Sequence, residues 1–376
     1  MRRHIDSLVV HLTSVHPRYD TRIFLKECRS LAGNGYSVVL VVADGKGDEF
    51  KDGVSILDVG KPAGRLKRMF LTTRLLFKKA LELDADIYHL HDPELMPLGI
   101  KLKRLGKCVV FDAHEDAPKQ LLGKPYLIKP LKILLSWTLR YIEAWACKRF
   151  DAIVTATPSI QDKFLPINST ALVINNYPML GELGCDREDV EKLPQVCYVG
   201  GITSIRGIHE VISAMSLMKS RVRLQLVGNF SEASVYSEAR NNPGWTSVDE
   251  LGYQDRDGVR QVMSRCIGGL VTFLPLPNHI DAQPNKMFEY MSAGIPVIAS
   301  DFPLWREIVI GNECGLCVDP TSPNEIAEAI DYLVTHPEEA QRMGDNGRVA
   351  VQRLYNWKNE EQKLLAIYAE LMRGLE

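Results

Sequence analysis

Residues Leu274–Val309, LPLPNHIDAQPNKMFEYMSAGIPVIASDFPLWREIV, decide the fold of this chain. Pro284 and Asn285 are typical of a helix start, with Asn285 as the capping residue. The predicted helix ends at Gly294, a residue type that terminates many helices. The apolar run 295–300 follows at once and predicts a buried parallel strand. A helix that leads directly into a buried strand indicates an α/β fold.

The start of this helix carries a lysine and a glutamate. Lys286 and Glu289 are three residues apart, so they share one face of the first turn. The free backbone N–H groups of a helix start attract anions, especially phosphate. A cation and a carboxylate at such a place suit a ligand with phosphate and hydroxyl groups, such as a nucleotide sugar. On spacing alone, a solvated surface pair is an equal alternative.

The run PNKMFEYMSAGIPVIASD, which begins at Pro284, resembles the signature of the retaining family 4 glycosyltransferases with the GT-B fold (glycosyl transferases group 1). That family has two acidic residues eight apart, and the matching positions here are Asp281 and Glu289. The resemblance implies that Glu289 binds ribose hydroxyls. It also implies that Asp281, which stands where the family has Glu, meets the donor sugar.

Composition predicts two ordinary globular domains. The chain has 376 residues, is 45% hydrophobic and 24% charged, and carries a net charge of −2, so no basic field indicates a nucleic-acid partner. We expect no membrane-spanning segment and no signal peptide. The eight cysteines show no disulfide framework, and Cys314 and Cys317 lack a second pair. We interpret them as small buried apolar residues of a cytoplasmic protein.

Short apolar runs alternate with helical stretches along the whole chain, which is typical of doubly wound parallel sheets. The first set of predicted strands is Ser7–Leu12, Ser37–Val42, Ile87–Leu90, Val109–Asp112 and Ile153–Ala156, with a helix over Asp20–Leu31. The second set is Val196–Tyr198, Val222–Val227, Ile267–Phe273, Ile295–Ala299 and Leu316–Val318. The fold class is therefore α/β with two Rossmann-like domains, and the resemblance implies that they face each other across a cleft.

A segment mixed in Gly, Pro and acids, 176–194, indicates an interdomain linker. We expect residues 1–176 to form the acceptor-side domain and residues 195–355 the nucleotide-sugar domain. For the last segment, 356–376, the resemblance implies a helix that crosses back to the first domain.

A glycine loop follows the first strand of the second domain. Gly200 and Gly201 let backbone approach a ligand closely, and Arg206 can grip a diphosphate. The resemblance gives this loop two cations, of which Arg206 is the second, while Gly201 stands in place of the first. Lys286 is expected to replace the lost charge. A plain strand-to-helix turn with a solvated arginine is the alternative.

Two further turns resemble family segments near the nucleotide. Asn229 lies in the turn Val227-Gly228-Asn229, and Tyr253 ends Leu251-Gly252-Tyr253. The resemblance implies that both line the donor site, and both patterns also fit ordinary turns.

Histidines follow two strands of the first domain. His114 follows strand 109–112, and the resemblance implies contact with the donor sugar; a structural histidine is the alternative. His91 and Asp92, which follow strand 87–90, are acceptor-side candidates. Two histidines and an aspartate suggest a metal site, but an H-x-H strand can share a face without any ligand role. Because the family needs no metal, we expect no metal and no cofactor.

The loop 16–22 replaces a glycine-rich loop that many relatives carry. Asp20 and Arg22 are the polar candidates for acceptor binding in this loop. The alternative, which we favour, is that Asp20 caps the next helix.

Two stretches of the first domain combine basic and apolar residues. Residues 61–80 carry seven Lys or Arg and no acid, and residues 121–150 interleave basic side chains with Leu, Ile, Trp and Tyr. Such helices lie at anionic membrane surfaces, so an anionic membrane at the inner face of the cell is a predicted partner. The alternative is an outer helix whose apolar side packs on the sheet.

The predicted function is a glycosyltransferase (EC 2.4). The resemblance implies transfer from a nucleotide diphosphate sugar to a saccharide or lipid-linked acceptor with retention, in cell-surface polysaccharide or glycolipid synthesis. Arg206 and Lys286 would stabilise the leaving diphosphate, and His114 and Asp281 are the other catalytic candidates. The alternatives are a nucleotide-sugar epimerase with the same fold and a non-catalytic partner subunit.

Overall fold

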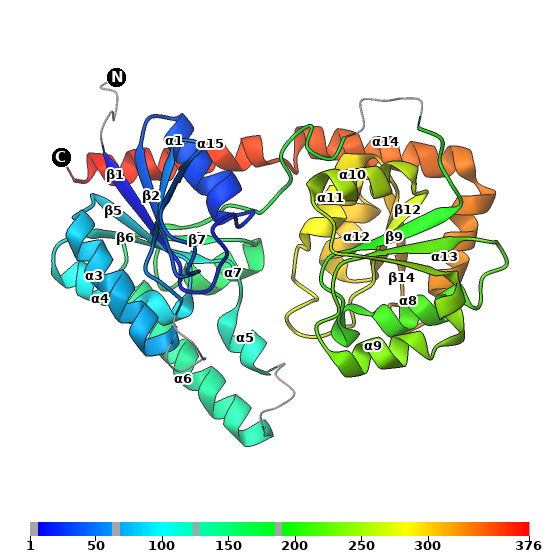
Figure 1. The fold of residues 1–376 in the computed structure, drawn as a ribbon, viewed down its shortest axis with the longest axis horizontal. Coiled ribbons are helices and arrows are strands. Elements are labelled where there is room, and N and C mark those ends of the chain that lie inside the picture. The colour runs from blue at the N-terminus through cyan, green and yellow to red at the C-terminus, as the bar shows by residue number, and fades with distance from the viewer. Residues whose placement is uncertain (1–6, 62–67, 123–127, 185–189, 376) are drawn as a thin grey trace. The chain divides into compact units, whose positions relative to one another are not determined.

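The computed structural model describes residues 7–61, 68–122, 128–184 and 190–375. The chain divides into two compact units (Figure 1). The first unit contains residues 1–176 and 359–376, and the second contains 177–358. The C-terminal helix α15 (Trp357–Arg373) therefore lies mainly in the first unit.

The first unit is built on one eight-stranded sheet with the order β3-β4-β2-β1-β5-β6-β7-β8. All paired strands are parallel except β3, which is antiparallel to β4. The strands are β1 (Leu8–Leu12), β2 (Ser37–Val42), β3 (Glu49–Lys51), β4 (Val54–Asp58), β5 (Ile87–Leu90), β6 (Cys108–Ala113), β7 (Ala152–Thr155) and β8 (Ala171–Val173). The helices besides α15 are the π-helices η1 (Ile23–Cys28) and η2 (Arg68–Thr72), α1 (Arg29–Gly33), α3 (Thr73–Leu83), the 3₁₀ turn η3 (Pro93–Leu95), α4 (Met96–Arg104), α5 (Ala117–Leu122), α6 (Lys129–Cys147) and α7 (Pro158–Phe164).

The second unit carries a parallel six-stranded sheet with the order β11-β10-β9-β12-β13-β14. The strands are β9 (Gln195–Val199), β10 (Arg223–Val227), β11 (Val248–Gly252), β12 (Gly268–Val271), β13 (Val297–Ser300) and β14 (Gly315–Val318). The helices are the 3₁₀ turns η4 (Ser204–Arg206) and η5 (Pro243–Ser247), α8 (Ile208–Met215), α9 (Ala233–Arg240), α10 (Arg256–Arg265), α11 (Asn285–Ala293), α12 (Pro303–Val309), α13 (Pro323–Thr335) and α14 (Pro337–Arg353).

The predicted α/β class with two parallel sheets is confirmed. The central strands were found because they are buried on both faces and are therefore continuously apolar. Strands β3, β4, β8 and β11 were not predicted, because they are partly exposed and carry mixed residues. In each sheet the order reverses beside the first strand, at β1/β5 and at β9/β12. Ligands of such sheets bind at the carboxyl ends of the strands beside that reversal.

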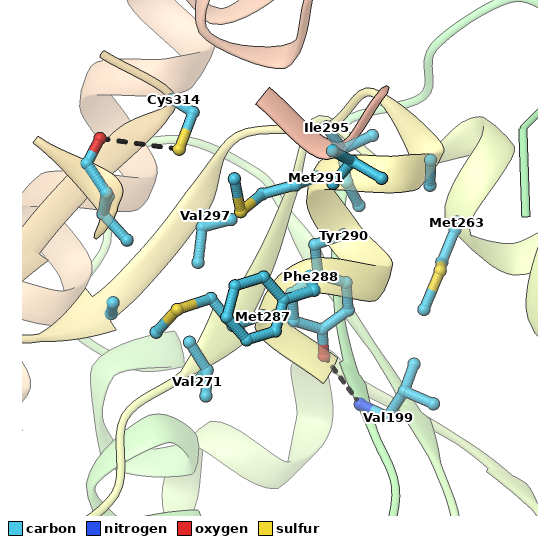
Figure 2. Close-up of a cluster of buried hydrophobic side chains, with 14 of the residues drawn as sticks. Val199, Met263, Val271, Met287, Phe288, Tyr290, Met291, Ile295, Val297 and Cys314 are labelled. Atoms are coloured by element: carbon cyan, nitrogen blue, oxygen red, sulfur yellow. Dashed lines mark hydrogen bonds between the residues drawn. The ribbon is translucent and has the colours of Figure 1, made fainter. Parts of the chain in front are cut away.

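The signature helix α11 is anchored in the core of the second unit. Figure 2 shows Met287, Phe288 and Tyr290 among the buried apolar side chains, and the backbone N–H of Val199 donates to the Tyr290 hydroxyl at 3.0 Å. This bond fixes α11 to the end of β9. The first turn of α11 therefore faces the loop that contains Gly200 and Gly201. The predicted helix end at Gly294 is confirmed by its left-handed φ of 70°.

Two details of the predicted helix starts need correction. Asn285 is the first helical residue rather than the cap, because Pro284 takes the capping position without a side-chain hydrogen bond. The helix predicted over residues 20–31 is instead the π-helix η1 followed by the short α1. The capping position of η1 is Arg22 rather than Asp20. Asp20 lies two residues earlier, and its Oδ1 accepts from the backbone N–H groups of Arg22 at 2.8 Å and Ile23 at 3.0 Å.

None of the helices in the described ranges combines the length and apolar character that a membrane span needs. The cysteines of these ranges are free thiols, and all are buried except Cys317, which is partly exposed.

Candidate functional site

The carboxyl ends of β9, β10 and β11 form one edge of exposed backbone. Gly200 has a φ of 110° and Gly228 a φ of 134°, a region that favours glycine. A Cβ on Gly228 would lie 2.0 Å from the carbonyl oxygen of Gly200, so the two turns contact each other directly. The Gly228 N–H donates to the carbonyl of Gly252 at 2.8 Å. Glycines are therefore required here, and the edge offers backbone rather than side chains to a ligand.

Lys286 lies in the first turn of α11 and is buried, with 7% of its surface exposed. Its Nζ lies 3.6 Å from the ring centroid of Tyr198, and no described residue accepts a hydrogen bond from it. Burial lowers the pKa of this amine well below its usual value. The amine also lies 3.9 Å from the point where a Cβ of Gly200 would stand. An unpaired buried ammonium is costly, so an anionic ligand at the glycine loop is its expected partner.

Arg206 and Lys286 both lie near the aromatic ring of Phe273. The Arg206 guanidinium carbon is 5.4 Å from the Phe273 ring centroid, and the Lys286 amine is 5.5 Å from that centroid. Arg206 also donates to the carbonyl oxygen of Gly201 at 3.2 Å. A Cβ on Gly201 would stand 3.0 Å from Arg206 Nη1, so a side chain there would displace the guanidinium. The structure thus brings together the two cations that the sequence predicted to cooperate.

Glu289 is half-buried in α11 and is paired with an arginine that sequence reasoning missed. Arg256 Nη1 donates to Glu289 Oε1 at 2.8 Å, and Arg256 Nε donates to Glu182 Oε1 at 2.6 Å. Burial works against the charge of Arg256, but these two carboxylates raise its pKa. Arg256 therefore holds the Glu289 carboxylate in one orientation. Arg256 is the first residue of α10 and belongs to no recognised sequence motif. No local pattern in the sequence could therefore have identified it.

The remaining donor-side candidates lie at or near this edge. Tyr253 is 76% exposed just beyond β11, and Asn229 is exposed beyond β10, where its carbonyl accepts from the Ile202 N–H at 3.1 Å. Asp281 is exposed in the loop that precedes α11. The Trp305 indole donates to Ala282 in that loop at 2.6 Å, which holds the loop against α12.

Two cavities of this unit lie at the opposite edge of its sheet. One of about 650 Å³ is lined by Gln195 and Arg223, which begin β9 and β10. The other, of about 380 Å³, is lined by Ile295 and Pro296. Neither contains a predicted site residue. Because ligands of parallel sheets bind at the carboxyl ends of the strands, we place the site at the glycine edge.

In the first unit, His114 is the most accessible of the predicted strand-end residues that follow β5 and β6. It keeps 20% of its side-chain surface, and its Nδ1 lies 3.6 Å from Asp112 Oδ2. Burial opposes protonation, but the Asp112 carboxylate prevails and raises the pKa of His114. The His16 ring packs against the His114 ring at 5.0 Å. Imidazoles are thus available to a ligand at this edge of the first sheet.

The acceptor-side candidates His91, Asp92 and Arg22 are buried, at 0%, 2% and 5% exposure. Asp92 accepts from the Ser14 N–H at 2.6 Å, and Arg22 makes two bonds of 2.8 Å to Asp112. These side chains are engaged in contacts within the first unit, and their expected role in acceptor binding stays a prediction. Asp20, whose carboxylate accepts from the backbone N–H groups of Arg22 and Ile23, keeps 23% of its side-chain surface.

Behind these residues lies a buried polar cluster that was not predicted as a site. It comprises His11, Glu27, His89 and His91, and none of these side chains is exposed. Burial lowers the pKa of each imidazole and raises the pKa of the Glu27 carboxyl. Only the H-x-H pattern of His89 and His91 hinted at it in the sequence.

Two family models match this chain, one in each of its two units. The sequence model described as Glycosyltransferase Family 4 matches residues 21–175, and the one described as Glycosyl transferases group 1 matches residues 186–350. The chain belongs to the family 4 glycosyltransferases. Together the two matches include β2 to β8 of the first unit and the whole sheet of the second.

Curated relatives of this family 4 chain act on different sugars, according to their names. Glycogen synthase from Mycobacterium tuberculosis is 22% identical over 260 residues, covering 64% of this chain and 59% of that protein. D-rhamnosyltransferase WbpZ from Pseudomonas aeruginosa is 25% identical over 296 residues, covering 74% of this chain and 73% of that protein. The chain thus spans less than two thirds of the mycobacterial relative.

Solved structures show that the fold is of the GT-B type. Sucrose-phosphate synthase from Thermosynechococcus elongatus superimposes with a TM-score of 0.79 at 17% identity, covering 98% of this chain and 100% of that one. HepE from Anabaena in complex with UDP-glucose superimposes with a TM-score of 0.74 at 16% identity, covering 96% and 99%.

Proposed function

We propose that this family 4 chain is a glycosyltransferase that moves a sugar from a nucleotide diphosphate sugar to a saccharide or lipid-linked acceptor with retention. The setting we propose is cell-surface polysaccharide or glycolipid synthesis in the cytoplasm, at the inner face of the membrane. Relatives solved with UDP-glucose or UDP-2-fluoro glucose support a nucleotide-sugar donor.

The observation that carries this proposal is the buried, unpaired amine of Lys286 beside the backbone edge at Gly200. Free N–H groups at the start of α11, the amine and Arg206 together suit a diphosphate. The Glu289 carboxylate, three residues after Lys286, is placed to accept hydrogen bonds from ribose hydroxyls. His114 and Asp281 remain the candidates for contact with the transferred sugar.

The proposed chemistry is electrostatic. As the sugar leaves, negative charge grows on the diphosphate, and Lys286 and Arg206 stabilise it because they are already in place. We propose that this pair makes a divalent metal unnecessary for transfer. Turnover that survives brief exposure to EDTA would support this point, and loss of turnover restored only by Mg²⁺ or Mn²⁺ would contradict it.

Ligand-induced stabilisation tests the function directly. The protein is screened by thermal shift with UDP-, GDP- and ADP-sugars, since a ligand that binds the folded state raises apparent stability. The binding donor is then incubated with candidate acceptors, and the anomeric configuration of the product is determined. A new glycoside with retained configuration supports the proposal. Interconversion of the donor without an acceptor would make the chain an epimerase, and absence of both reactions a non-catalytic subunit.

A lipid-linked acceptor requires access to a membrane, and α6 supports such contact. Figure 1 shows α6 projecting beyond the rest of the first unit. Its side chains Leu134, Trp137 and Tyr141 are 63%, 73% and 71% exposed. Its one acidic residue, Glu143, is buried and pairs with Lys163 at 2.5 Å. An outer helix that packs its apolar side on the sheet would not leave these residues in water.

The other basic stretch, 61–80, exposes fewer apolar side chains: among its described residues Phe70 and Leu71 of η2 are 74% and 45% exposed. In α3, Leu76 and Ala80 are buried in the core, which agrees with an ordinary outer helix. Arg65 and Lys67, two of the basic residues of stretch 61–80, lie outside the described residues. We therefore assign the proposed membrane contact to α6.

We expect the protein to sediment with anionic vesicles in low salt and to be released by high salt. Changing Lys129, Lys132 and Arg140 to Gln is expected to weaken binding by about 3 kcal/mol, on the order of 100-fold, at roughly 1 kcal/mol per basic residue. Changing Leu134 and Trp137 to Ser is expected to weaken binding at every salt concentration.

The matched control for the apolar change is Leu217→Ser with Leu354→Ser, two exposed leucines of the second unit. Nucleotide binding should stay intact in all three variants. If wild type binds neutral and anionic vesicles equally, or neither, the membrane assignment is wrong.

A further inference from the structure

Four side chains of metal-ligating types converge in the interior of the first unit. His11 lies on β1, His89 on β5, His91 just after β5, and Glu27 on η1. Their donor atoms all lie within 4.8 Å of one another, and none of the four is exposed. The group lies where the sheet order reverses, so it joins β1, β5 and the helix that covers them.

The distances within this group fit one shared ion. Glu27 Oε2 lies 4.0 Å from His11 Nδ1, 3.9 Å from His89 Nδ1 and 3.9 Å from His91 Nε2. His11 Nδ1 and His91 Nε2 form a hydrogen bond of 2.9 Å, so the proton that they share is released when both bind the ion. Ligands at about 2.0–2.2 Å from a zinc ion stand roughly 3–4 Å from each other. The four donor atoms lie within 4.8 Å of one another, so side-chain shifts of about 1 Å would bring all four into range.

A hydrogen bond to a carboxylate orients His91 as a ligand. His91 Nδ1 lies 3.1 Å from Asp112 Oδ2, so the ring donates there and its Nε2 is left with a lone pair directed at the group. Asp112 is itself held by two bonds from Arg22. The Tyr368 hydroxyl lies 2.8 Å from His89 Nδ1 and 3.5 Å from His11 Nε2, so it must release His89 Nδ1 when that nitrogen binds the ion. A carboxylate that orients a ligating histidine is the usual outer shell of a zinc site.

The Glu27 carboxylate is the member of the group that a bound cation would stabilise most. Neither of its oxygens accepts a hydrogen bond from any described residue, although both are buried. Its Oε1 lies 3.2 Å from Arg22 Nε, but Arg22 directs its two hydrogen bonds of 2.8 Å to Asp112. A buried carboxylate without donors is costly. An ion at Oε2 would satisfy it.

We propose that His11, Glu27, His89 and His91 bind a Zn²⁺ ion. Three imidazoles and one carboxylate suit zinc, whereas Mg²⁺ and Ca²⁺ prefer oxygen ligands. Because all four ligands are fully buried, the ion has no open position for a substrate, so its role is structural. It ties β1, β5 and η1 together beneath the surface that carries His114. It takes no part in the proposed diphosphate chemistry of the second unit.

Metal content is the first test. The untagged protein is purified without chelators, gel-filtered, and analysed for transition metals by mass spectrometry. We expect one zinc per chain. Prolonged dialysis against a strong chelator should lower the melting temperature, and added Zn²⁺ should restore it. Refilling with Co²⁺ should give the visible absorption bands of a nitrogen- and oxygen-ligated cobalt site.

The variant Glu27→Gln distinguishes a zinc site from a metal-free cluster by the sign of its effect. With zinc bound, the variant loses a ligand, so zinc content and melting temperature both fall. Without zinc, glutamine keeps the shape and removes a buried charge, so the melting temperature stays or rises. His209→Gln, a partly exposed histidine of the second unit, is the control and should keep full zinc content.

The result that overturns the proposal needs no variant. Wild-type protein with no zinc and no cobalt bands, and with a melting temperature unmoved by Zn²⁺, would show that the cluster holds no metal.

Discussion

Replacing Glu289 by alanine is expected to weaken nucleotide binding by roughly 1.5–3 kcal/mol, the range for hydrogen bonds to a charged group. This corresponds to a loss of about 10- to 150-fold in affinity. Transfer should be nearly abolished, because the ribose contact also positions the reacting phosphate. Calorimetric titration of the donor and initial rates measure the two effects. Glu307→Ala, an exposed glutamate on α12, is the matched control.

The pairing of Glu289 with Arg256 permits a sharper version of this experiment. Arg256→Gln leaves the carboxylate in place but removes the bond of 2.8 Å that orients it. We expect a smaller loss of affinity than for Glu289→Ala. If the folded Glu289→Ala variant binds and turns over like wild type, the ribose assignment is wrong.

Replacing Lys286 by methionine is expected to lower turnover by about 100- to 1,000-fold, the effect of removing one preorganised charge-stabilising group. The same change should raise stability by about 1–3 kcal/mol, because it removes an unsatisfied buried polar group. Loss of activity together with a gain of stability would indicate that Lys286 serves ligand binding and not folding. Rates and chemical denaturation measure both, with Lys219→Met, an exposed lysine, as the control.

The stability gain should depend on pH in one direction. Burial lowers the pKa of Lys286, so at neutral pH the unfolded chain holds this proton more tightly than the folded one. The penalty that methionine removes should therefore shrink as pH rises toward 10.5, the ordinary pKa of lysine. Nucleotide binding should also raise this pKa and take up protons, which titration in buffers of different ionisation enthalpy detects. A stability gain that is independent of pH would contradict this account of Lys286.

Arg206→Ala should lower turnover as well, and its effect should not add to that of Lys286→Met. Both cations lie over Phe273 and are assigned to one diphosphate, and groups that act on one ligand are coupled. The double variant measures this coupling. Losses that sum strictly would show that the two side chains do not share a phosphate.

Local patterns determined much of this protein. Continuous apolar runs predicted the central strands, because a strand buried on both faces needs apolar residues throughout. The glycines and the Lys286–Glu289 spacing predicted a donor site, because a loop after a parallel strand must lie at the binding edge of its sheet. The length and residue pattern of one continuous stretch suffice for such inferences.

Contacts between distant residues were decided only by the tertiary structure. His11 and His91 meet across 80 positions, and Arg22 and Asp112 across 90, because the order of strands and their register place them side by side. No local pattern contains that register. Burial is also decided by the tertiary structure. Lys286 and Glu289 share a helical face, but packing between elements places the Lys286 amine against the Tyr198 ring and pairs the Glu289 carboxylate with Arg256. Sequence therefore predicted a binding edge, while packing between elements decided which side chains are paired, which are buried, and which remain without a protein partner.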